Sequence, residues 1–166
     1  RIKSVPFARV LDGDVGYVPL QMFRTTSTDE VRAAVDSLVG EGVRGLVLDL
    51  RGNPGGLLEE GIGVTELFLD AGNTVVETRG RGRGQSERYA SSRAAAFPRL
   101  PLAILVNGTS ASASEIVAGA LQDHDRALLV GMPTYGKGSV QTLFPVGAGN
   151  RLRFTTALWY TPVGRY

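Results

Sequence analysis

The sequence contains no cysteine and one histidine among its 166 residues. The lack of cysteine excludes disulfide bonds, thiolate metal sites and cysteine nucleophiles. The stability of the fold must therefore come from the packing of its core. A catalytic triad that needs a histidine would have to use His124.

Long apolar runs and a strong charge imbalance are also missing. No run approaches the ~20 residues that cross a bilayer, and residues 1–10 lack the apolar region of a signal peptide, so we expect no transmembrane segment in this chain. The net charge of +2 does not call for a nucleic-acid partner. The length suits a single domain over residues 1–166. The start at Arg1 and the stop inside an aromatic-rich run lead us to expect truncated ends.

Apolar runs of strand length alternate with helical patterns, and this order predicts a layered α/β domain. Helix 27–38 opens on Ser27 and Glu30 at capping-box spacing and is expected to end at Gly40 or Gly42. We expect a largely parallel sheet and an antiparallel hairpin around the loop 147–150. The predicted strands are 15–20, 45–50, 74–78, 102–107, 126–131, 139–146 and 151–161, and the other helices are 57–69 and the stretch that ends at 123.

Residues 80–101 are rich in Gly, Arg and Ser, which predicts a mobile surface excursion. The run RGRGRG at 79–84 could bind a nucleic-acid backbone. It is short, and the aromatic residue close by is Tyr89, so we favour a flexible hairpin loop and expect no nucleic-acid partner.

Three serines alternate with alanines in NGTSASASEIVAGALQD, residues 107–123. A continuous helix places His124 about 18 Å from Ser112 and Asp123 about 16 Å from it, so neither can hydrogen-bond to that serine. His124 is expected to be a polar residue near a helix C-terminus. Ser112 and Glu115 have capping-box spacing, which leaves a structural role open for this serine.

Ser110 and Ser114 fit ordinary capping and first-turn roles. A serine nucleophile without histidine needs another base, and a lysine can serve once its pKa falls well below the usual 10.4. Lys137 is the candidate, because Gly136 and Gly138 allow close approach of the backbone.

Tyr135 and Val140 could supply an apolar wall for Lys137, although a lysine in a surface turn fits the same stretch. The stretch GMPTYGKGS, residues 131–139, also matches part of a phosphate-binding loop. Gly138 stands where such a loop needs Ser or Thr, and strand-like residues follow it instead of a helix. We therefore do not expect a nucleotide site.

The turn RGNPGG, residues 51–56, follows the predicted central strand and exposes backbone amides at its carboxyl end. It could simply join a strand to a helix. In a functional reading, Gly55 or Gly56 could donate one oxyanion N–H and Ala113 the other.

Three segments together, LVLDLRGNPGG, LVNGTSASASEIVAGALQD and GMPTYGKGSVQTLFPV, closely resemble the catalytic core of the C-terminal processing peptidases, or tail-specific proteases. The resemblance extends from residue 11 to residue 165. It implies a serine peptidase with a Ser-Lys dyad on a crotonase/Clp-protease-like core of β-β-α units. The implied roles are Ser112 as nucleophile, Lys137 as base, Gln141 as the residue that orients the lysine, and Gly56 and Ala113 as oxyanion donors.

The same resemblance implies cleavage of polypeptides near their C-termini through an acyl-enzyme, without cofactor or metal. It implies a location outside the cytoplasm (periplasm, cell envelope or lumen). Asp123 matches a position implicated in some members, and we expect it to be structural. Members usually carry a PDZ domain that docks the substrate C-terminus, and this sequence contains none. Because the resemblance includes retinoid-binding relatives, a non-catalytic binding module for an apolar ligand or peptide is the alternative.

Overall fold

The computed structural model describes residues 2–82 and 86–166. Residues 83–85, which include part of the Arg-Gly run, lie outside the described residues. The elements follow in this order: β1 (Arg9–Leu11), β2 (Val15–Pro19), α1 (Ser27–Gly40), β3 (Gly45–Asp49), α2 (Leu58–Glu66), β4 (Thr74–Gly80), β5 (Glu87–Ala90), β6 (Leu102–Val106), α3 (Ala113–Asp123), β7 (Leu128–Gly131), β8 (Ser139–Pro145) and β9 (Arg151–Tyr160).

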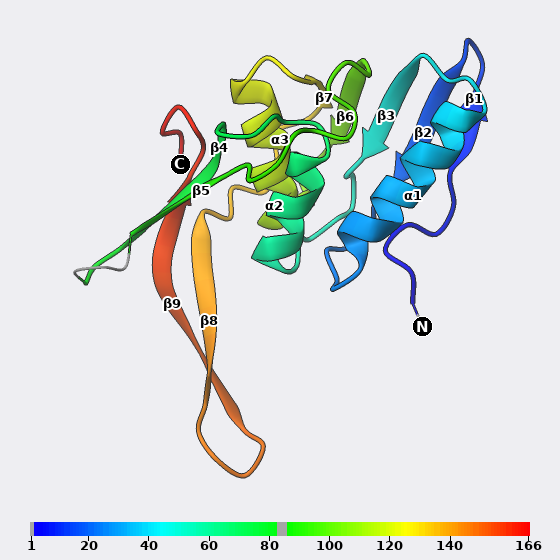
Figure 1. Cartoon of the computed structure of the whole chain (residues 1–166). Coiled ribbons are helices and arrows are strands. Elements are labelled where there is room, and N and C mark those ends of the chain that lie inside the picture. Colours follow the sequence, from blue (N-terminus) through cyan, green and yellow to red (C-terminus); the bar gives the residue numbers. More distant parts are fainter. Residues whose placement is uncertain (1, 83–85) are drawn as a thin grey trace.

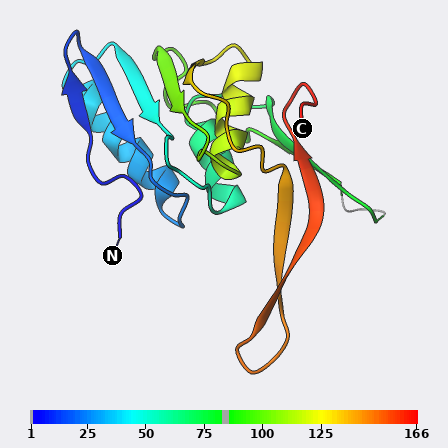
Figure 2. The same ribbon diagram turned by 180° about the vertical axis from the view of Figure 1, so that it is seen from behind.

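Two sheets frame the molecule (Figure 1). The first has the order β1-β2-β3-β6-β7, with β1 antiparallel and the other strands parallel. The second is antiparallel, with the order β5-β4-β9-β8. Helices α2 and α3 lie between the two sheets in both views (Figures 1 and 2). This arrangement confirms the predicted layered α/β fold with a parallel core and an antiparallel C-terminal hairpin.

The central position predicted for strand 45–50 is also confirmed, because β3 lies in the middle of the first sheet. Helix α1 buries the stripe predicted from its periodicity, since Val31, Val35 and Leu38 are almost inaccessible to solvent. The capping box predicted at its start is wrong. Thr26 is the N-cap, and the Ser27 hydroxyl accepts a hydrogen bond from Arg24 N–H at 2.7 Å instead.

Residues 86–101 are more ordered than their composition predicts. They contain β5, which pairs with β4, and they bury Ser91 and Phe97 against the core. Ser91 donates a hydrogen bond to the carbonyl of Leu69 at 2.8 Å. Short strands flanked by polar residues carry little periodic signal, so the sequence did not reveal β5.

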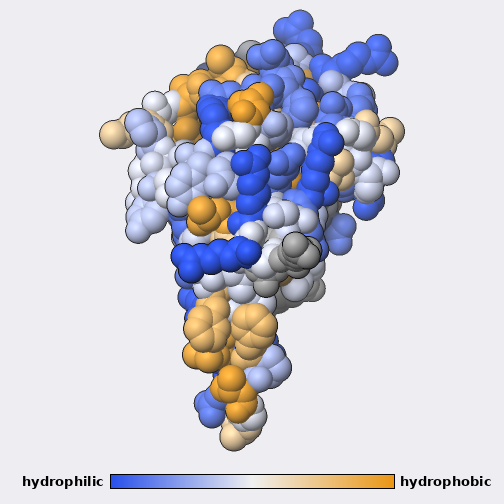
Figure 3. Space-filling view, turned by 90° about the vertical axis from the view of Figure 1, so that its left-hand side faces the viewer, coloured by the Kyte–Doolittle hydropathy of each residue, from blue (hydrophilic) through white to orange (hydrophobic). Residues whose placement is uncertain are grey.

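The β8–β9 hairpin extends away from the rest of the fold (Figure 1). Large apolar side chains cover much of its far end (Figure 3), and Phe144 packs edge-on against Phe154 with ring centroids 6.2 Å apart. No helix in residues 2–82 and 86–166 is long and apolar enough to cross a membrane.

Candidate active site

Ser112 is the N-cap of α3, at the end of the turn that follows β6. Residues 107–112 are called the serine turn below. Ser112 has a positive φ of 57° with ψ −116°, a backbone conformation that residues other than glycine rarely adopt. Such a conformation costs about 1–3 kcal/mol and persists only where its surroundings impose it. The strain therefore falls on the serine that the sequence singles out as a candidate nucleophile.

Glu115 explains how Ser112 is held. Its carboxylate is buried and accepts the N–H of Ser112 at 2.7 Å, which forms the capping box expected for these two residues. The same carboxylate accepts the N–H groups of Gly136 at 2.6 Å and Lys137 at 3.0 Å. Glu115 thus connects the serine turn to the segment 132–138, called the lysine segment below.

Trp159, on β9, fixes the lysine segment from its other side. The Trp159 indole N–H donates to the carbonyl of Lys137 at 2.8 Å, and the Trp159 backbone N–H donates to the carbonyl of Gly138 at 2.8 Å. The prediction that Tyr135 forms an apolar wall is wrong, because this side chain is 69% exposed. No helix follows the lysine segment within the described chain, and β8 begins at Ser139, so a phosphate-binding loop is not formed.

Residues 51–56, the glycine turn, lie directly against the serine turn. A Cβ on Gly55 would stand 2.6 Å from the carbonyl oxygen of Ala111, and one on Gly56 would stand 2.0 Å from the carbonyl oxygen of Phe23. Both glycines also have positive φ, 94° and 151°. Only glycine allows the chain to pass this close to the serine turn at Gly55 and to Phe23 at Gly56.

The sequence left Gly55 and Gly56 as alternative oxyanion donors, and their N–H groups differ in their hydrogen bonds. The N–H of Gly55 donates to Asn53 Oδ1 at 2.9 Å. Among the described residues, no acceptor is found for the N–H of Gly56 or for that of Ala113. The role of these two N–H groups as oxyanion donors stays a prediction.

One cavity of about 660 Å³ brings the sequence-predicted residues together. Ser112, Lys137, Gln141, Gly56 and Ala113 all line it. Just after the lysine segment, the pairing of β8 with β9 shifts register between Val140 and Gln141, where β9 has one extra residue, Thr156. The apolar lining of the cavity includes Met22, Leu57, Leu58, Ile116, Val140 and Trp159.

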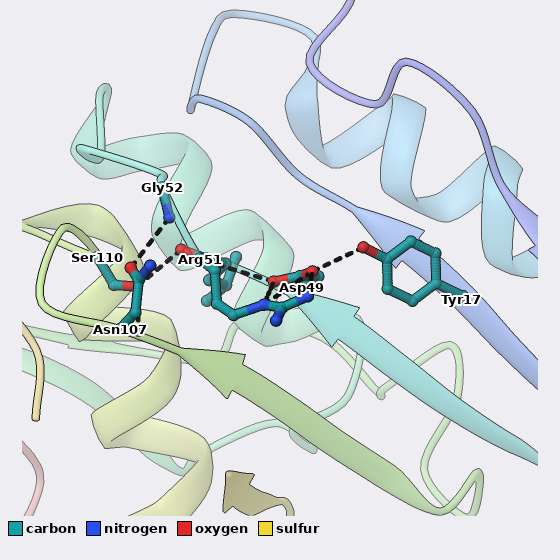
Figure 4. Close-up of polar contacts among 7 residues, drawn as sticks. Tyr17, Asp49, Arg51, Gly52, Asn107 and Ser110 are labelled. Atoms are coloured by element: carbon teal, nitrogen blue, oxygen red, sulfur yellow. Dashed lines mark hydrogen bonds and ion pairs between the residues drawn. The ribbon is translucent and has the colours of Figure 1, made fainter. Parts of the chain in front are cut away.

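Polar contacts fix the carboxyl end of β3 (Figure 4). Asp49 accepts the Tyr17 hydroxyl at 2.6 Å and binds the Arg51 guanidinium, with Nη2 at 2.7 Å from Oδ2. Nearby, the side chain of Asn107 accepts the N–H of Gly52 at 3.1 Å, and Ser110 donates to the carbonyl of Leu50 at 2.8 Å. These bonds hold the glycine turn and the serine turn against each other.

Three other polar residues, at positions 114, 123 and 124, have structural contacts. His124 Nε2 donates to the carbonyl of Thr74 at 2.7 Å, and Ser114 donates to the carbonyl of Asn53 at 3.0 Å. Asp123 accepts the N–H of Val163 at 3.1 Å and pairs with Arg165, near the opposite end of α3 from Ser112. Burial raises the pKa of Asp123, but hydrogen bonds from Thr161, Val163 and Arg165 outweigh it and leave the pKa below its ordinary value.

Three residues that support this site, Asn53, Trp159 and Asp49, were not predicted from the sequence. A signal existed for Asn53 and Asp49, because Asn and Asp often bind the backbone N–H two residues ahead. Asn53 binds Gly55 in this way, and Asp49 binds Arg51 at 2.9 Å. The contact of Trp159 with Lys137 joins residues 22 positions apart, and no local sequence pattern predicts it.

The model of peptidase family S41 matches residues 14–166. The chain belongs to peptidase family S41. It is 45% identical over 168 residues to a carboxy-terminal-processing protease of Bartonella bacilliformis, covering 99% of this chain and 38% of that protein. It is 44% identical over 162 residues to the chloroplastic carboxyl-terminal-processing peptidase 2 of Arabidopsis thaliana, covering 98% and 31%.

Among solved structures, the photosystem II D1 C-terminal processing protease superposes with a TM-score of 0.81 at 36% identity, covering 98% of this chain and 43% of that one. The chain thus spans less than half the length of each of these proteins. Membership of family S41 confirms the predicted resemblance to the C-terminal processing peptidases.

Proposed function

We propose that residues 1–166 form the catalytic core domain of a serine endopeptidase that cleaves polypeptides near their C-termini with a Ser-Lys dyad. The observation that carries the proposal is the shared cavity. It combines a strained serine, a lysine and two backbone N–H groups without described acceptors. These are the parts that acyl transfer requires: a nucleophile, a base and an oxyanion site.

In this mechanism the amine of Lys137 takes the proton of the Ser112 hydroxyl as its oxygen attacks the substrate carbonyl. The N–H groups of Gly56 and Ala113 stabilise the negative oxygen of the tetrahedral intermediate. The protonated lysine then gives its proton to the leaving amine, and a serine ester remains. Water hydrolyses this acyl-enzyme with Lys137 again as base, while Gln141, which lines the same cavity, orients the lysine.

The cavity's apolar lining favours substrates with apolar side chains next to the cleaved bond. The processing of C-termini follows the names of the related proteins. We also propose that the activity lies outside the cytoplasm, in keeping with a chloroplastic relative. Fractionation of the source cells would test this location.

The direct test is cleavage of an unstructured polypeptide with an apolar C-terminus. We expect Ser112→Ala and Lys137→Ala each to lower kcat by at least about 10³-fold, because the dyad acts as a unit. The chain offers matched controls. Lys3→Ala removes its other lysine, which is exposed, and Ser91→Ala removes a buried hydroxyl from outside the cavity lining.

Both controls should retain the parent rate. Persistent cleavage by both Ser112→Ala and Lys137→Ala would rule out the dyad. Peptide binding without any hydrolysis by the parent protein would instead favour the non-catalytic binding module.

A further inference from the structure

We propose that Asn53 is the positioning residue of the oxyanion site. Its side chain sets the direction of the Gly56 N–H, and its backbone carbonyl couples the glycine turn to the serine turn. The inference rests on the proposed peptidase function and adds a residue that does not itself line the cavity.

The Asn53 side chain is completely buried, and both of its polar atoms are used. Its Nδ2 donates to the carbonyl of Leu20 at 2.7 Å, just beyond the end of β2. Its Oδ1 accepts the N–H of Gly55 at 2.9 Å. The amide therefore fastens the glycine turn to a fixed point of the first sheet.

The backbone carbonyl of Asn53 makes a second set of contacts, with the residues around Ser112. It accepts the N–H of Ala111 at 3.0 Å and the hydroxyl of Ser114 at 3.0 Å. Ala113, the other proposed oxyanion donor, lies between these two residues in the sequence. Asn53 thus contacts Gly55, next to one proposed donor, and residues close to Ala113, the other donor, on both sides.

The Gly55 hydrogen bond matters because two successive glycines have a wide choice of backbone angles. With its N–H bound to Asn53, Gly55 is held in one conformation, and the peptide group that carries the Gly56 N–H has a defined direction. The carbonyl of Gly55 is also held, since it accepts the N–H of Phe23 at 3.0 Å. Loss of the Asn53 side chain removes one of these two constraints.

An oxyanion donor acts mainly in the transition state, where the oxygen carries negative charge. A misdirected Gly56 N–H should therefore lower kcat and leave KM nearly unchanged. A residue that only stabilises the fold should lower activity in proportion to the unfolded fraction instead. The two roles differ in measurable quantities.

The test compares Asn53→Ala with Asn53→Asp and with Ser91→Ala, a control that loses a buried hydrogen bond to Leu69 outside the cavity lining. Rates are expressed per folded molecule, below each melting transition. We expect Asn53→Ala to lose about 10- to 100-fold in kcat with KM within about threefold, which is less than the loss of a donor itself. Binding of a peptide boronate, which forms a tetrahedral adduct with serine, should weaken in parallel, while binding of a product peptide should not.

Asn53→Asp keeps an oxygen acceptor for the Gly55 N–H but loses the donor to Leu20. We expect this variant to melt at a lower temperature and to keep its kcat within about fivefold of the parent. If Asn53→Ala does not fold, Asn53→Asp decides. A folded Asn53→Asp protein with a loss above about 100-fold would contradict the role of the Gly55 bond.

Two further results would overturn the inference: an Asn53→Ala protein whose kcat stays within twofold of the parent, or an equal loss of kcat in Ser91→Ala. Absence of Ser112-dependent hydrolysis in the unsubstituted protein is a different failure. It contradicts the peptidase function itself and removes this role of Asn53 with it.

Discussion

Asp49 is a carboxylate held at the end of β3 by more than one partner. Its side chain is buried and accepts hydrogen bonds from Tyr17 and from the backbone and guanidinium of Arg51. Burial raises the pKa of Asp49, but the bonds from Arg51 and Tyr17 outweigh it and leave the pKa below its ordinary value. The ionised form is therefore favoured by folding.

This carboxylate should make stability depend on pH. Because the folded-state pKa is lower than the unfolded value near 3.9, the stabilisation is present above about pH 4 and is lost as the pH falls through the folded-state pKa. We expect Asp49→Asn to lower the free energy of unfolding by about 1–3 kcal/mol at pH 7. The difference from the parent should shrink at pH 3, as measured by urea denaturation.

Asp36→Asn is the control, because Asp36 forms an exposed ion pair with Arg32. Such pairs contribute at most about 1 kcal/mol. A difference for Asp49→Asn that stays the same from pH 7 to pH 3 would contradict the assigned ionisation.

Individual site residues could be inferred from the sequence where a side chain has a distinctive chemical role. The spacing of Ser112 and Glu115 predicted the capping box that the structure contains. Helix geometry excluded a hydrogen bond between His124 and Ser112, and in the structure His124 contacts Thr74 instead. The second and third partners of Glu115, Gly136 and Lys137, could not be inferred, because they come from another part of the chain.

At the scale of elements, Glu115 joins α3 to the lysine segment. One carboxylate binds three backbone N–H groups, one from Ser112 and two from the segment that carries Lys137. Hydrogen bonds to an ionised acceptor are about twice as strong as neutral ones. The relative position of helix and segment therefore depends on this charge.

Glu115→Gln should loosen that junction without changing the volume of the side chain. We expect kcat to fall by about 10- to 100-fold, because small displacements of a base cost rate steeply. Glu66→Gln is the matched control, since Glu66 is buried and accepts the N–H of Ser92 at 2.7 Å but does not line the cavity. Equal rates for Glu115→Gln and the parent would show that the junction does not position Lys137.

Elements with a strong periodic pattern were predictable, whereas the short strand β5 was not. The apolar stripe of α1 and the apolar run of β3 carry their own burial signal. Strand β5 depends on β4, and its residues alternate only weakly. The N-cap of α1 was misassigned because Thr26 and Ser27 are both good capping residues, and tertiary contacts decide between them.

At the scale of the whole molecule, the site is assembled from three segments that are distant in the sequence. The glycine turn follows the first sheet's β3, the serine turn follows β6, and the lysine segment leads into the second sheet at β8. The order of motifs predicted that these segments belong together. Their meeting in one cavity depends on how α2 and α3 separate the sheets, which sequence periodicity cannot supply.

The most direct test of the dyad is detection of the acyl-enzyme. The protein is mixed with an activated peptide ester, quenched in acid and analysed by intact-mass spectrometry, and the adduct is located by digestion. We predict one acyl group on Ser112 in the parent protein and none in Ser112→Ala or Lys137→Ala. Hydrolysis of the ester with the acyl group on another residue, or with equal labelling of Lys137→Ala, would contradict the Ser112–Lys137 mechanism.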